Sequence, residues 1–321
     1  MAGIKISIVH KVRWTPQEHA RLEAIGEARF CPDYPSGEED LLERMRDAHI
    51  VISATNVAFP AGIIESCSTL RMISLWSTGY NNVDREAAKR CGVTVTNVPG
   101  YAAYSVSEHA WAMVLHLAKR LGPADAHVRK HGFDWASFEG LEIHGLTVGI
   151  IGTGQIGARS AAIANGFGCR VLAFTRRPSP ERARALGVQF VDLPELLAQS
   201  DIIMIHAALE VETRGLLDQA AFAAMARRPI LVNTARGAII EMDALLDALE
   251  SGQIRGAGLD VFWDEPPHWD TPGMQRLLAA DKVVLSPHSS MYTDAAFRTL
   301  TRICIDNIEA FLNSQPANVV S

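Results

Sequence analysis

The sequence predicts an α/β protein that contains two doubly wound parallel sheets. Short apolar runs alternate with longer amphipathic stretches along almost the whole chain. This alternation is typical of parallel strands that are joined by crossover helices. The pattern occurs in two series, and 321 residues are more than one compact core usually contains. We therefore expect two domains, each built on its own sheet.

Each series has a defined set of expected elements. In the first series the expected strands are 5–9, 50–53, 72–75 and 93–96, and the expected helices include 38–47 and 84–90. In the second series the expected helices include 155–165 and 242–250, and the expected strands are 147–151, 170–174, 189–191, 201–205, 230–233, 256–261 and 282–285. No repeat or low-complexity linker interrupts either series.

The segment 105–121 separates the two series and is expected to form a helix. It opens with Ser105-Val-Ser-Glu108, which fits a capping box with Ser105 as the N-cap. The segment is then apolar on nearly every side, so it is buried either in a core or against another subunit. The second alternative would make the protein a homodimer through this helix.

Composition excludes several classes of function. The chain is 48% apolar and 21% charged, with a net charge of −6 and no basic run, which argues against a nucleic-acid partner. The five cysteines are scattered and never spaced as CxxC, so neither a disulfide framework nor a metal site is expected. No signal-like amino terminus and no apolar window of 18 residues occurs, which predicts a cytoplasmic protein without membrane contact.

A glycine-rich turn follows the first strand of the second series. Gly152, Gly154 and Gly157, with Gln155 and Ile156 between them, form a GxGxxG motif directly after an apolar strand. Such glycines permit a tight turn, close approach of a pyrophosphate and close helix packing. Methyltransferases carry similar turns, and glycines can be kept for packing alone. The position inside a strand–turn–helix unit favours a Rossmann domain that binds a dinucleotide.

The end of the next strand bears on the choice of dinucleotide. NAD sites usually place an acidic residue here, whereas this chain has Thr175, Arg176 and Arg177. The sequence therefore shows no carboxylate to repel a 2′-phosphate and two guanidinium groups to bind it. These arginines could instead point into water. We expect NADP(H) to be preferred, with NAD(H) possible.

Three later strands are each followed by a residue capable of chemistry. The segments are 232–237 with Arg236, 259–266 with Glu265, and 285–288 with His288. Ligands of open α/β sheets bind beyond the carboxyl ends of strands, so these ends are candidates for one pocket. Taken singly, each residue could be structural: a surface ion pair, a loop charge or a hydrogen-bonded histidine. Their occurrence together behind a dinucleotide turn favours an active site.

With Asn97-Val-Pro-Gly100 and Ser105-Val-Ser-Glu-His109, these motifs resemble those of the D-isomer-specific 2-hydroxyacid dehydrogenases. The resemblance covers essentially the whole chain. It implies that Arg236 binds the substrate carboxylate, that His288 is the acid/base and that Glu265 is its partner. It also implies that Asp260 holds the nicotinamide carboxamide. These roles suit the chemistry, because histidine can donate a proton near neutral pH and arginine offers a fixed fork to a carboxylate.

The resemblance implies further contacts and a discontinuous domain. The additional cofactor-binding residues would be Thr78, Thr234, Ala235, Arg236, His288 and Ser290. His206 also ends a strand and is the only rival to His288, and it is expected to line the cofactor. Substrate would be bound by Arg236 and His288 together with Asn56, Ser77, Thr78 and Gly79. The substrate domain, flavodoxin-like, would comprise residues 1–100 and 290–321, completed by a helix over about 292–312, and the Rossmann domain would comprise 101–289.

The resemblance is greatest to hydroxypyruvate and glyoxylate reductases, through segments 75–82 and 99–101. Phosphoglycerate dehydrogenases usually carry a basic residue beside the serine of segment 53–56. Here the neighbours are Ile52 and Ala54, so an unphosphorylated 2-keto acid is expected. Trp135 lies in a segment that in such enzymes approaches the neighbouring subunit. A different class, the dinucleotide-sensing corepressors, keeps the same Arg, Glu and His, but this sequence has none of their extended tails.

Overall fold

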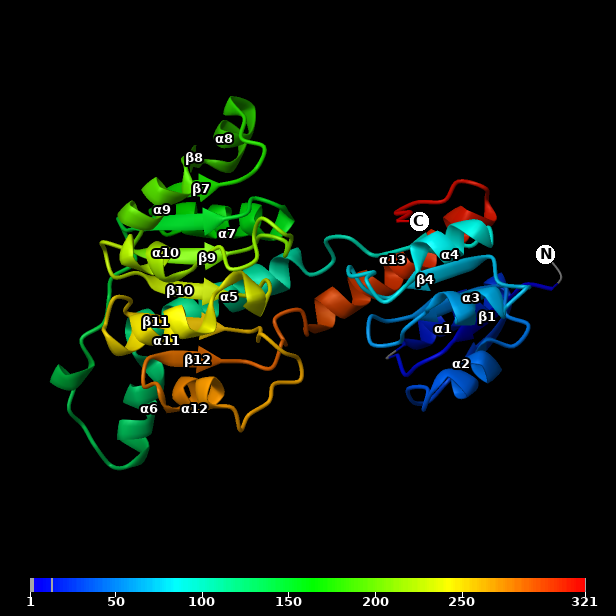
Figure 1. Cartoon of the computed structure of the whole chain (residues 1–321), viewed down its shortest axis with the longest axis horizontal. Helices are drawn as coiled ribbons and strands as arrows, with labels where there is room; N and C mark the ends of the chain where they lie inside the picture. Colours follow the sequence, from blue (N-terminus) through cyan, green and yellow to red (C-terminus); the bar gives the residue numbers. More distant parts are fainter. Residues whose placement is uncertain (1–2, 13, 321) are drawn as a thin grey trace. The chain divides into compact units, whose positions relative to one another are not determined.

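The computed structural model describes residues 3–12 and 14–320. It consists of two compact units, residues 1–101 with 294–321 and residues 102–293. Each unit is built around its own parallel sheet (Figure 1). The predicted α/β class with two doubly wound sheets is confirmed. The expected boundaries near residues 100 and 290 lie close to the ends of these units.

The sheet of the first unit has the flavodoxin-like order β2-β1-β3-β4-β5. Its strands are β1 (Lys5–Ile8), β2 (Glu27–Phe30), β3 (Ile50–Ser53), β4 (Met72–Leu75) and β5 (Thr94–Thr96), all parallel. Strand β2 was not expected from the sequence. It lies at the sheet edge and alternates exposed with half-buried residues, so it lacks the apolar run that marks the other strands.

Helices cover both faces of this sheet. On one face α1 (Pro16–Ile25) and α13 (Asp294–Leu312) bury Leu22, Leu300, Cys304, Ile305 and Ile308 against the sheet. On the other face lie α2 (Glu38–Met45), α3 (Ala61–Glu65) and α4 (Arg85–Arg90), with a separate apolar core. A segment from the end of the sequence thus completes the layer over the first strands.

The sheet of the second unit has the order β12-β11-β10-β9-β6-β7-β8. This is the Rossmann order with one further strand, and the order reverses between β6 and β9. The strands are β6 (Thr147–Ile151), β7 (Arg170–Phe174), β8 (Gln189–Phe190), β9 (Ile202–Ile205), β10 (Ile230–Asn233), β11 (Gly256–Leu259) and β12 (Val283–Leu285). All pair in parallel, so the loops that follow β9 to β12 lie along one edge.

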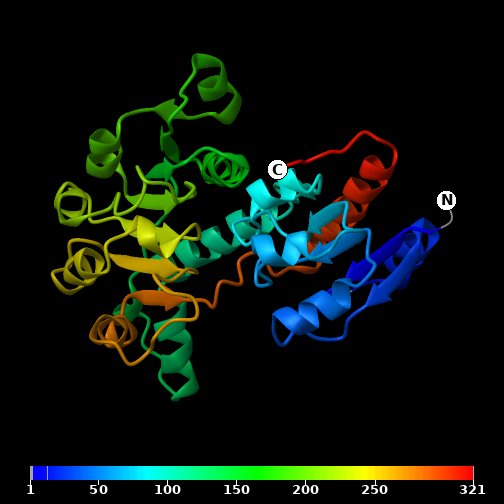
Figure 2. The ribbon, with the colours of Figure 1, turned by 45° about the vertical axis from the view of Figure 1, so that its right-hand side comes forward.

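Two helical layers enclose the second sheet (Figure 2). Helices α5 (Ala103–Lys119) and α7 (Gln155–Gly166) pack on one face, and α9 (Leu193–Gln199), α10 (Gln219–Ala223), α11 (Met242–Glu250) and α12 (Pro272–Ala279) pack on the other. The remaining helices are α6 (Leu121–Arg129), α8 (Pro180–Leu186) and the 3-10 turns Ala136–Phe138 and Gly237–Ile239. None of the helices in the described part of the chain has the length and apolar character needed to span a bilayer.

The expected capping box at Ser105 is wrong. Helix α5 begins two residues earlier, at Ala103, and its N-cap is Ala102. Ser105 lies inside the first turn, where its hydroxyl donates to the carbonyl oxygen of Ser290 instead of capping the helix. Trp111, Met113 and other apolar residues of α5 pack in the core of the second unit.

Candidate active site

The glycine turn connects β6 to α7, at the point where the strand order of the second sheet reverses. Gly152 has φ +94°, which favours glycine, and a Cβ on Gly157 would lie 2.0 Å from the Gly152 carbonyl oxygen. Gly154 is the N-cap of α7, makes no side-chain cap and has open space around its missing Cβ. The turn therefore offers uncapped amides and room for close approach, which fits a dinucleotide pyrophosphate.

His206 directly follows β9 and lies beside the glycine turn. Its backbone N–H donates to the Ile151 carbonyl at 2.8 Å, and its Nε2 lies 2.8 Å from the Ser160 hydroxyl of α7. Its Nδ1 lies 3.4 Å from the Thr234 hydroxyl. Burial lowers the pKa of His206 to about 4, so the ring is neutral at physiological pH.

The expectation that no carboxylate lies near Thr175, Arg176 and Arg177 is wrong. Glu210, from the loop that follows β9, forms a bidentate ion pair with Arg176, in which Nη2 donates to Oε1 at 2.8 Å. This ion pair could not be predicted from the sequence, because the two residues are 34 positions apart. Both side chains are exposed, and exposed pairs of this kind contribute about 0–1 kcal/mol. Arg176 can therefore leave Glu210 at little cost.

The loop after β10 is shaped by Asn233. Its Oδ1 accepts from the Ala235 amide at 2.9 Å, and its Nδ2 donates to the Arg236 carbonyl at 2.9 Å. Asn233 is fully buried, whereas Arg236 is exposed. The buried amide of Asn233 thus fixes the backbone between Ala235 and Arg236. The Arg236 side chain itself donates to the Ala235 carbonyl at 2.6 Å.

Asp260 follows β11 and organises the loop after β12. Its Oδ1 accepts from the Ser286 hydroxyl at 2.5 Å and from the Ser289 amide at 2.8 Å, while Oδ2 accepts from the Ser290 amide at 2.9 Å. The Asp260 side chain has no accessible surface. Both carboxylate oxygens accept hydrogen bonds from the loop after β12. Binding of the nicotinamide carboxamide by Asp260 stays a prediction.

Glu265 and His288 come together at the ends of β11 and β12. His288 Nδ1 lies 2.6 Å from Glu265 Oε2, and Glu265 Oε1 accepts from the Phe262 amide at 3.1 Å. A carboxylate can only accept from the ring, so Nδ1 carries the proton and Nε2 is the other available nitrogen. His288 also has φ +51°, an uncommon conformation for a non-glycine residue. The hydrogen bonds of Asp260 to the two following amides hold this strained loop.

The pair opens onto an apolar pocket of about 450 Å³. Besides Glu265 and His288, it is lined by Phe262, Pro266, Pro267, Trp269, Leu278, Leu285, Ser286 and Pro287. Arg236 follows the adjacent strand β10 but is not among the lining residues. The described structure therefore brings two of the three predicted catalytic side chains into direct contact and places the third on the neighbouring loop.

The predicted substrate residues of the first unit follow β3 and β4. The Ser77 hydroxyl donates to the Gly79 carbonyl at 2.8 Å, and the Thr78 hydroxyl donates to the Val98 carbonyl at 2.8 Å. Asn56 and Thr78 are exposed, and Ser77 is buried. These contacts give the 77–79 loop a fixed shape at the carboxyl edge of the first sheet.

Comparisons with known proteins agree on one family. Residues 111–290 match the family model "D-isomer specific 2-hydroxyacid dehydrogenase, NAD binding domain", which is more than half of the chain. The chain belongs to this family. It is therefore an oxidoreductase of the 2-hydroxyacid dehydrogenase type, and its cofactor is a nicotinamide dinucleotide.

Relatives and solved structures extend the family likeness over the whole chain. A glyoxylate reductase of Thermococcus onnurineus is 34% identical, covering 88% of this chain and 85% of its own. A hydroxypyruvate reductase of Blautia hydrogenotrophica is 34% identical, covering 94% of both chains. The structure of an acyclic imino acid reductase in complex with NADPH and D-Arg has a TM-score of 0.87 and 30% identity, covering 99% of this chain and all of that one.

Sequence reasoning missed several residues that build this dehydrogenase site. Ser286 stands inside the Ser-Pro-His motif, which could have marked it. Its hydroxyl donates to Asp260 and lies 2.9 Å from His109 Nε2 of α5, which therefore carries the proton. Arg182 of α8 donates to the Thr153 carbonyl and hydroxyl at 2.9 and 3.0 Å, which braces the glycine turn, and it had no sequence signal.

Proposed function

We propose that this dehydrogenase reduces a small unphosphorylated 2-keto acid, hydroxypyruvate or glyoxylate, to the D-2-hydroxyacid and prefers NADPH. The observation that carries the proposal is the Glu265–His288 hydrogen bond at the carboxyl edge of the Rossmann sheet. Glyoxylate and hydroxypyruvate reductases among the relatives support the substrate class. Lack of a basic residue in segment 52–54 supports the unphosphorylated form.

Each catalytic side chain has one role in this proposal. The glycine turn would hold the dinucleotide, whose reduced nicotinamide would supply the hydride that C2 of the keto acid accepts. In its doubly protonated form, His288 donates the Nε2 proton to the keto oxygen, and Glu265 keeps the ring oriented by accepting from Nδ1. Arg236, whose backbone carbonyl is bonded by the buried Asn233, binds the substrate carboxylate and polarises the keto oxygen.

Binding groups come from both units in this proposal. The glycine turn holds the pyrophosphate, while His206, Thr234, Ala235, Asp260 and Ser290 support the rest of the cofactor. In the first unit, Asn56 and the 77–79 loop bind the substrate through backbone amides and short polar side chains, and Thr78 also approaches the cofactor.

The preference for NADPH rests on Arg176 and Arg177. Both guanidinium groups are exposed after β7, and the ion pair of Arg176 with Glu210 is weak enough to exchange for a 2′-phosphate. A structural neighbour with 30% identity was solved with NADPH. NADH remains a second substrate in this proposal, because nothing else in the glycine turn discriminates between the two.

We also propose a homodimer in the region of the 105–121 helix, with the contact made chiefly by the segment that follows this helix. The faces of α5 are largely used by its own core. The segment that follows is different: α6 buries no residue, and Leu121, Val128, Phe133 and Trp135 are exposed, the last two by 96% and 86%. Exposed apolar side chains gathered in one segment mark a contact surface. Light scattering should give twice the chain mass, and a monomer at micromolar concentration would contradict the proposal.

The decisive experiment is a matrix of NADPH and NADH against hydroxypyruvate, glyoxylate, pyruvate and phosphohydroxypyruvate. We expect the highest kcat/KM with NADPH and one of the first two acids. Equal or higher kcat/KM with NADH would contradict the role given to Arg176 and Arg177. Binding of NADPH without turnover of any 2-keto acid would instead support a dinucleotide-sensing protein.

The variant His288→Ala separates catalysis from binding. Reduction should be lost, whereas the Kd for NADPH should stay within about twofold of wild type because the glycine turn is untouched. His268→Ala, which removes an exposed histidine near the pocket, is the matched control and should retain activity. Retained turnover in His288→Ala at neutral pH would show that another group donates the proton.

A further inference from the structure

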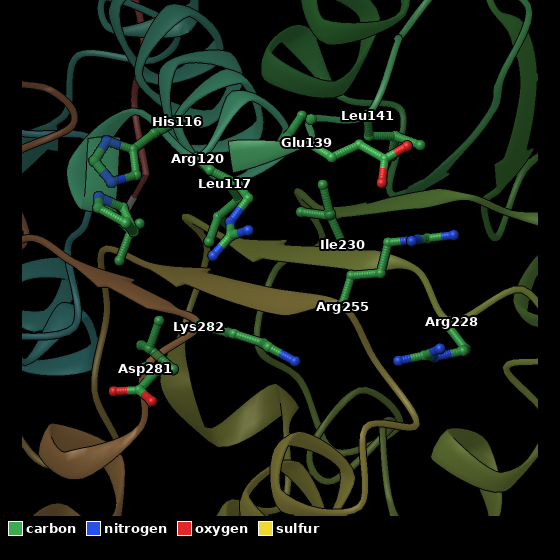
Figure 3. Close-up of a pocket in the computed structure, with 15 residues that line it drawn as sticks. His116, Leu117, Arg120, Glu139, Leu141, Arg228, Ile230, Arg255, Asp281 and Lys282 are labelled. Atoms are coloured by element: carbon green, nitrogen blue, oxygen red, sulfur yellow. The ribbon is translucent and has the colours of Figure 1, made fainter. Parts of the chain in front are cut away.

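The second unit has a larger pocket at the amino ends of its strands, whereas the proposed active site lies at their carboxyl ends (Figure 3). This pocket has a volume of about 980 Å³. Strands β10, β11 and β12 begin beside it, and the same strands end at the loops that carry Arg236, Asp260 and His288. A ligand in this pocket would therefore occupy a place separate from the proposed active site. The end of α5 and residues 139–141 form its other side.

Cationic side chains dominate the lining of this basic pocket. Arg120, Arg228, Arg255 and Lys282 line it, against two carboxylates, Glu139 and Asp281. This local excess of positive charge stands out in a chain whose net charge is −6. In Figure 3, Arg228, Arg255 and Lys282 lie on the strand side, and Arg120 reaches toward them from the helix side.

The side chains of two of these cations make contacts within the protein. Arg120 is at the carboxyl end of α5, donates to the Ser137 carbonyl at 2.7 Å and lies over the Phe138 ring at 5.7 Å. Arg228 donates from Nε to the Gly252 carbonyl at 2.8 Å, and its two terminal nitrogens remain for other partners.

Arg255 and Lys282 differ from these two residues in their side-chain contacts. Neither forms an ion pair or a side-chain hydrogen bond within residues 3–12 and 14–320, although both Glu139 and Asp281 line the same pocket. Elsewhere in the described chain the arginines commonly bind carboxylates: Arg44 contacts two and Arg276 contacts three. Arg255 and Lys282 are exposed and line one concavity, and unpaired cations in a concavity are suited to bind an anion from solution.

The sheet sets the spacing between the charges. Arg255 directly precedes β11, Lys282 directly precedes the neighbouring β12, and Arg228 stands two residues before β10 on the other side. The Arg255 amide donates to the Pro229 carbonyl, and the Ala257 amide donates to the Lys282 carbonyl, both at 2.9 Å. Neighbouring strands lie about 4.8 Å apart, so the three side chains start within about 10 Å across the sheet.

We propose that this basic pocket binds a small polyanion with at least two negatively charged groups, phosphates or carboxylates, bridged by Arg228, Arg255 and Lys282. A single small anion would engage only one or two of these cations, so the spacing favours an elongated ligand. Arginine forks bind phosphate or carboxylate oxygens in pairs, and Lys282 adds a point charge. The hollow offers ample space for such a molecule.

The test is a calorimetric titration of the full-length protein with pyrophosphate, citrate and orthophosphate at constant ionic strength. Saturating NADPH is present throughout, so that pyrophosphate cannot enter the glycine turn. We expect pyrophosphate or citrate to bind at least about tenfold more tightly than orthophosphate, and the tighter of the two identifies phosphate or carboxylate as the preferred group. Absence of pyrophosphate and citrate binding to the wild-type protein would overturn the proposal.

A matched pair of double variants locates the binding. Arg255→Gln/Lys282→Gln should weaken the affinity for the tighter anion by about tenfold or more, since charge-assisted bonds are lost at two positions. The control Arg46→Gln/Lys89→Gln removes the same charges from exposed positions outside the pocket and should bind as wild type does. Thermal unfolding and the Kd for NADPH check that both variants are folded. Equal weakening in the two double variants would show a nonspecific charge effect and refute the site.

Discussion

Substitution of Asp260 tests how the loop that carries His288, residues 286–290, is held in place. Its buried carboxylate accepts three hydrogen bonds from the Ser286–Ser290 segment, and His288 in the middle of that segment has a left-handed backbone. The substitution Asp260→Asn keeps the size of the side chain but replaces one acceptor oxygen with an NH₂ group. At least one of the two backbone donors, Ser289 or Ser290, then faces a donor instead of an acceptor.

The expected cost follows from these contacts. An unsatisfied buried donor costs about 1–3 kcal/mol, and the remaining bonds lose the strengthening that a charged acceptor gives. We expect Asp260→Asn to lower the free energy of unfolding by about 2–4 kcal/mol. Release of the strained loop also shifts the His288 ring, and a displacement of about 1 Å can reduce turnover by about 100-fold. The reduction should appear in kcat rather than in KM.

Denaturant unfolding, steady-state kinetics and the Kd for NADPH measure these effects separately. Ser286→Ala is the control, because it removes one hydroxyl donor, spares both backbone bonds and should cost about 1 kcal/mol. If Asp260 instead serves mainly to bind the nicotinamide carboxamide, the Kd for NADPH rises while stability is preserved. Wild-type stability together with wild-type kcat in Asp260→Asn would refute the loop-holding role.

The remaining predictions concern the cofactor side of the site. Burial lowers the pKa of His206 to about 4 from 6.5, so the unfolded chain binds a proton that the folded chain does not, and stability should fall by about 3 kcal/mol as the pH is lowered from 7 to 4. His206→Gln should reduce the pH slope of the unfolding free energy by up to one proton in that window, and an unchanged slope would contradict the assignment. Glu210→Gln should free Arg176 and lower the Kd for NADPH about fivefold with little effect on NADH, and an equal gain for both cofactors would count against the proposed 2′-phosphate contact. Gly157→Ala places a Cβ 2.0 Å from a carbonyl oxygen of the glycine turn, so it should cost about 1–3 kcal/mol and weaken cofactor binding, whereas Gly166→Ala in the same helix meets nothing within 4 Å and should be neutral or stabilising by calorimetry.

Strands buried on both faces were predictable because their apolar runs are unambiguous. Segments 50–53, 72–75, 147–151, 170–174 and 230–233 match β3, β4, β6, β7 and β10 residue for residue. The edge strand β2 was missed because half of its side chains face solvent. Ser105 was mistaken for the N-cap of α5, whereas the helix starts at Ala103 and the Ser105 hydroxyl bonds to Ser290, which is 185 positions away. Local capping rules cannot anticipate such a tertiary partner.

For the candidate site, the sequence motifs predicted several of the functional residues but not the hydrogen-bond and ion-pair partners of those residues. The family resemblance implied that Glu265 is the partner of His288, and the two side chains do meet, with 2.6 Å between Oε2 and Nδ1. The ion pair of Arg176 with Glu210 could not be foreseen, since a loop of another strand supplies the carboxylate. The internal use of Asp260 was equally hidden, because its partners are mostly backbone amides, which carry no signature in the sequence.

The interrupted first unit has a consequence for the way this chain folds during synthesis. Helix α13 covers one face of the first sheet, yet it follows all 192 residues of the second unit. Arg21 of α1, for example, binds Asp306 and Glu309 of α13 across 285 and 288 positions. The second unit is continuous and needs no later segment to complete its sheet, whereas the strands of the first unit keep an apolar face uncovered until α13 emerges. The apolar core on that face of the amino-terminal sheet therefore cannot be completed until the last helix of the unit has been synthesised.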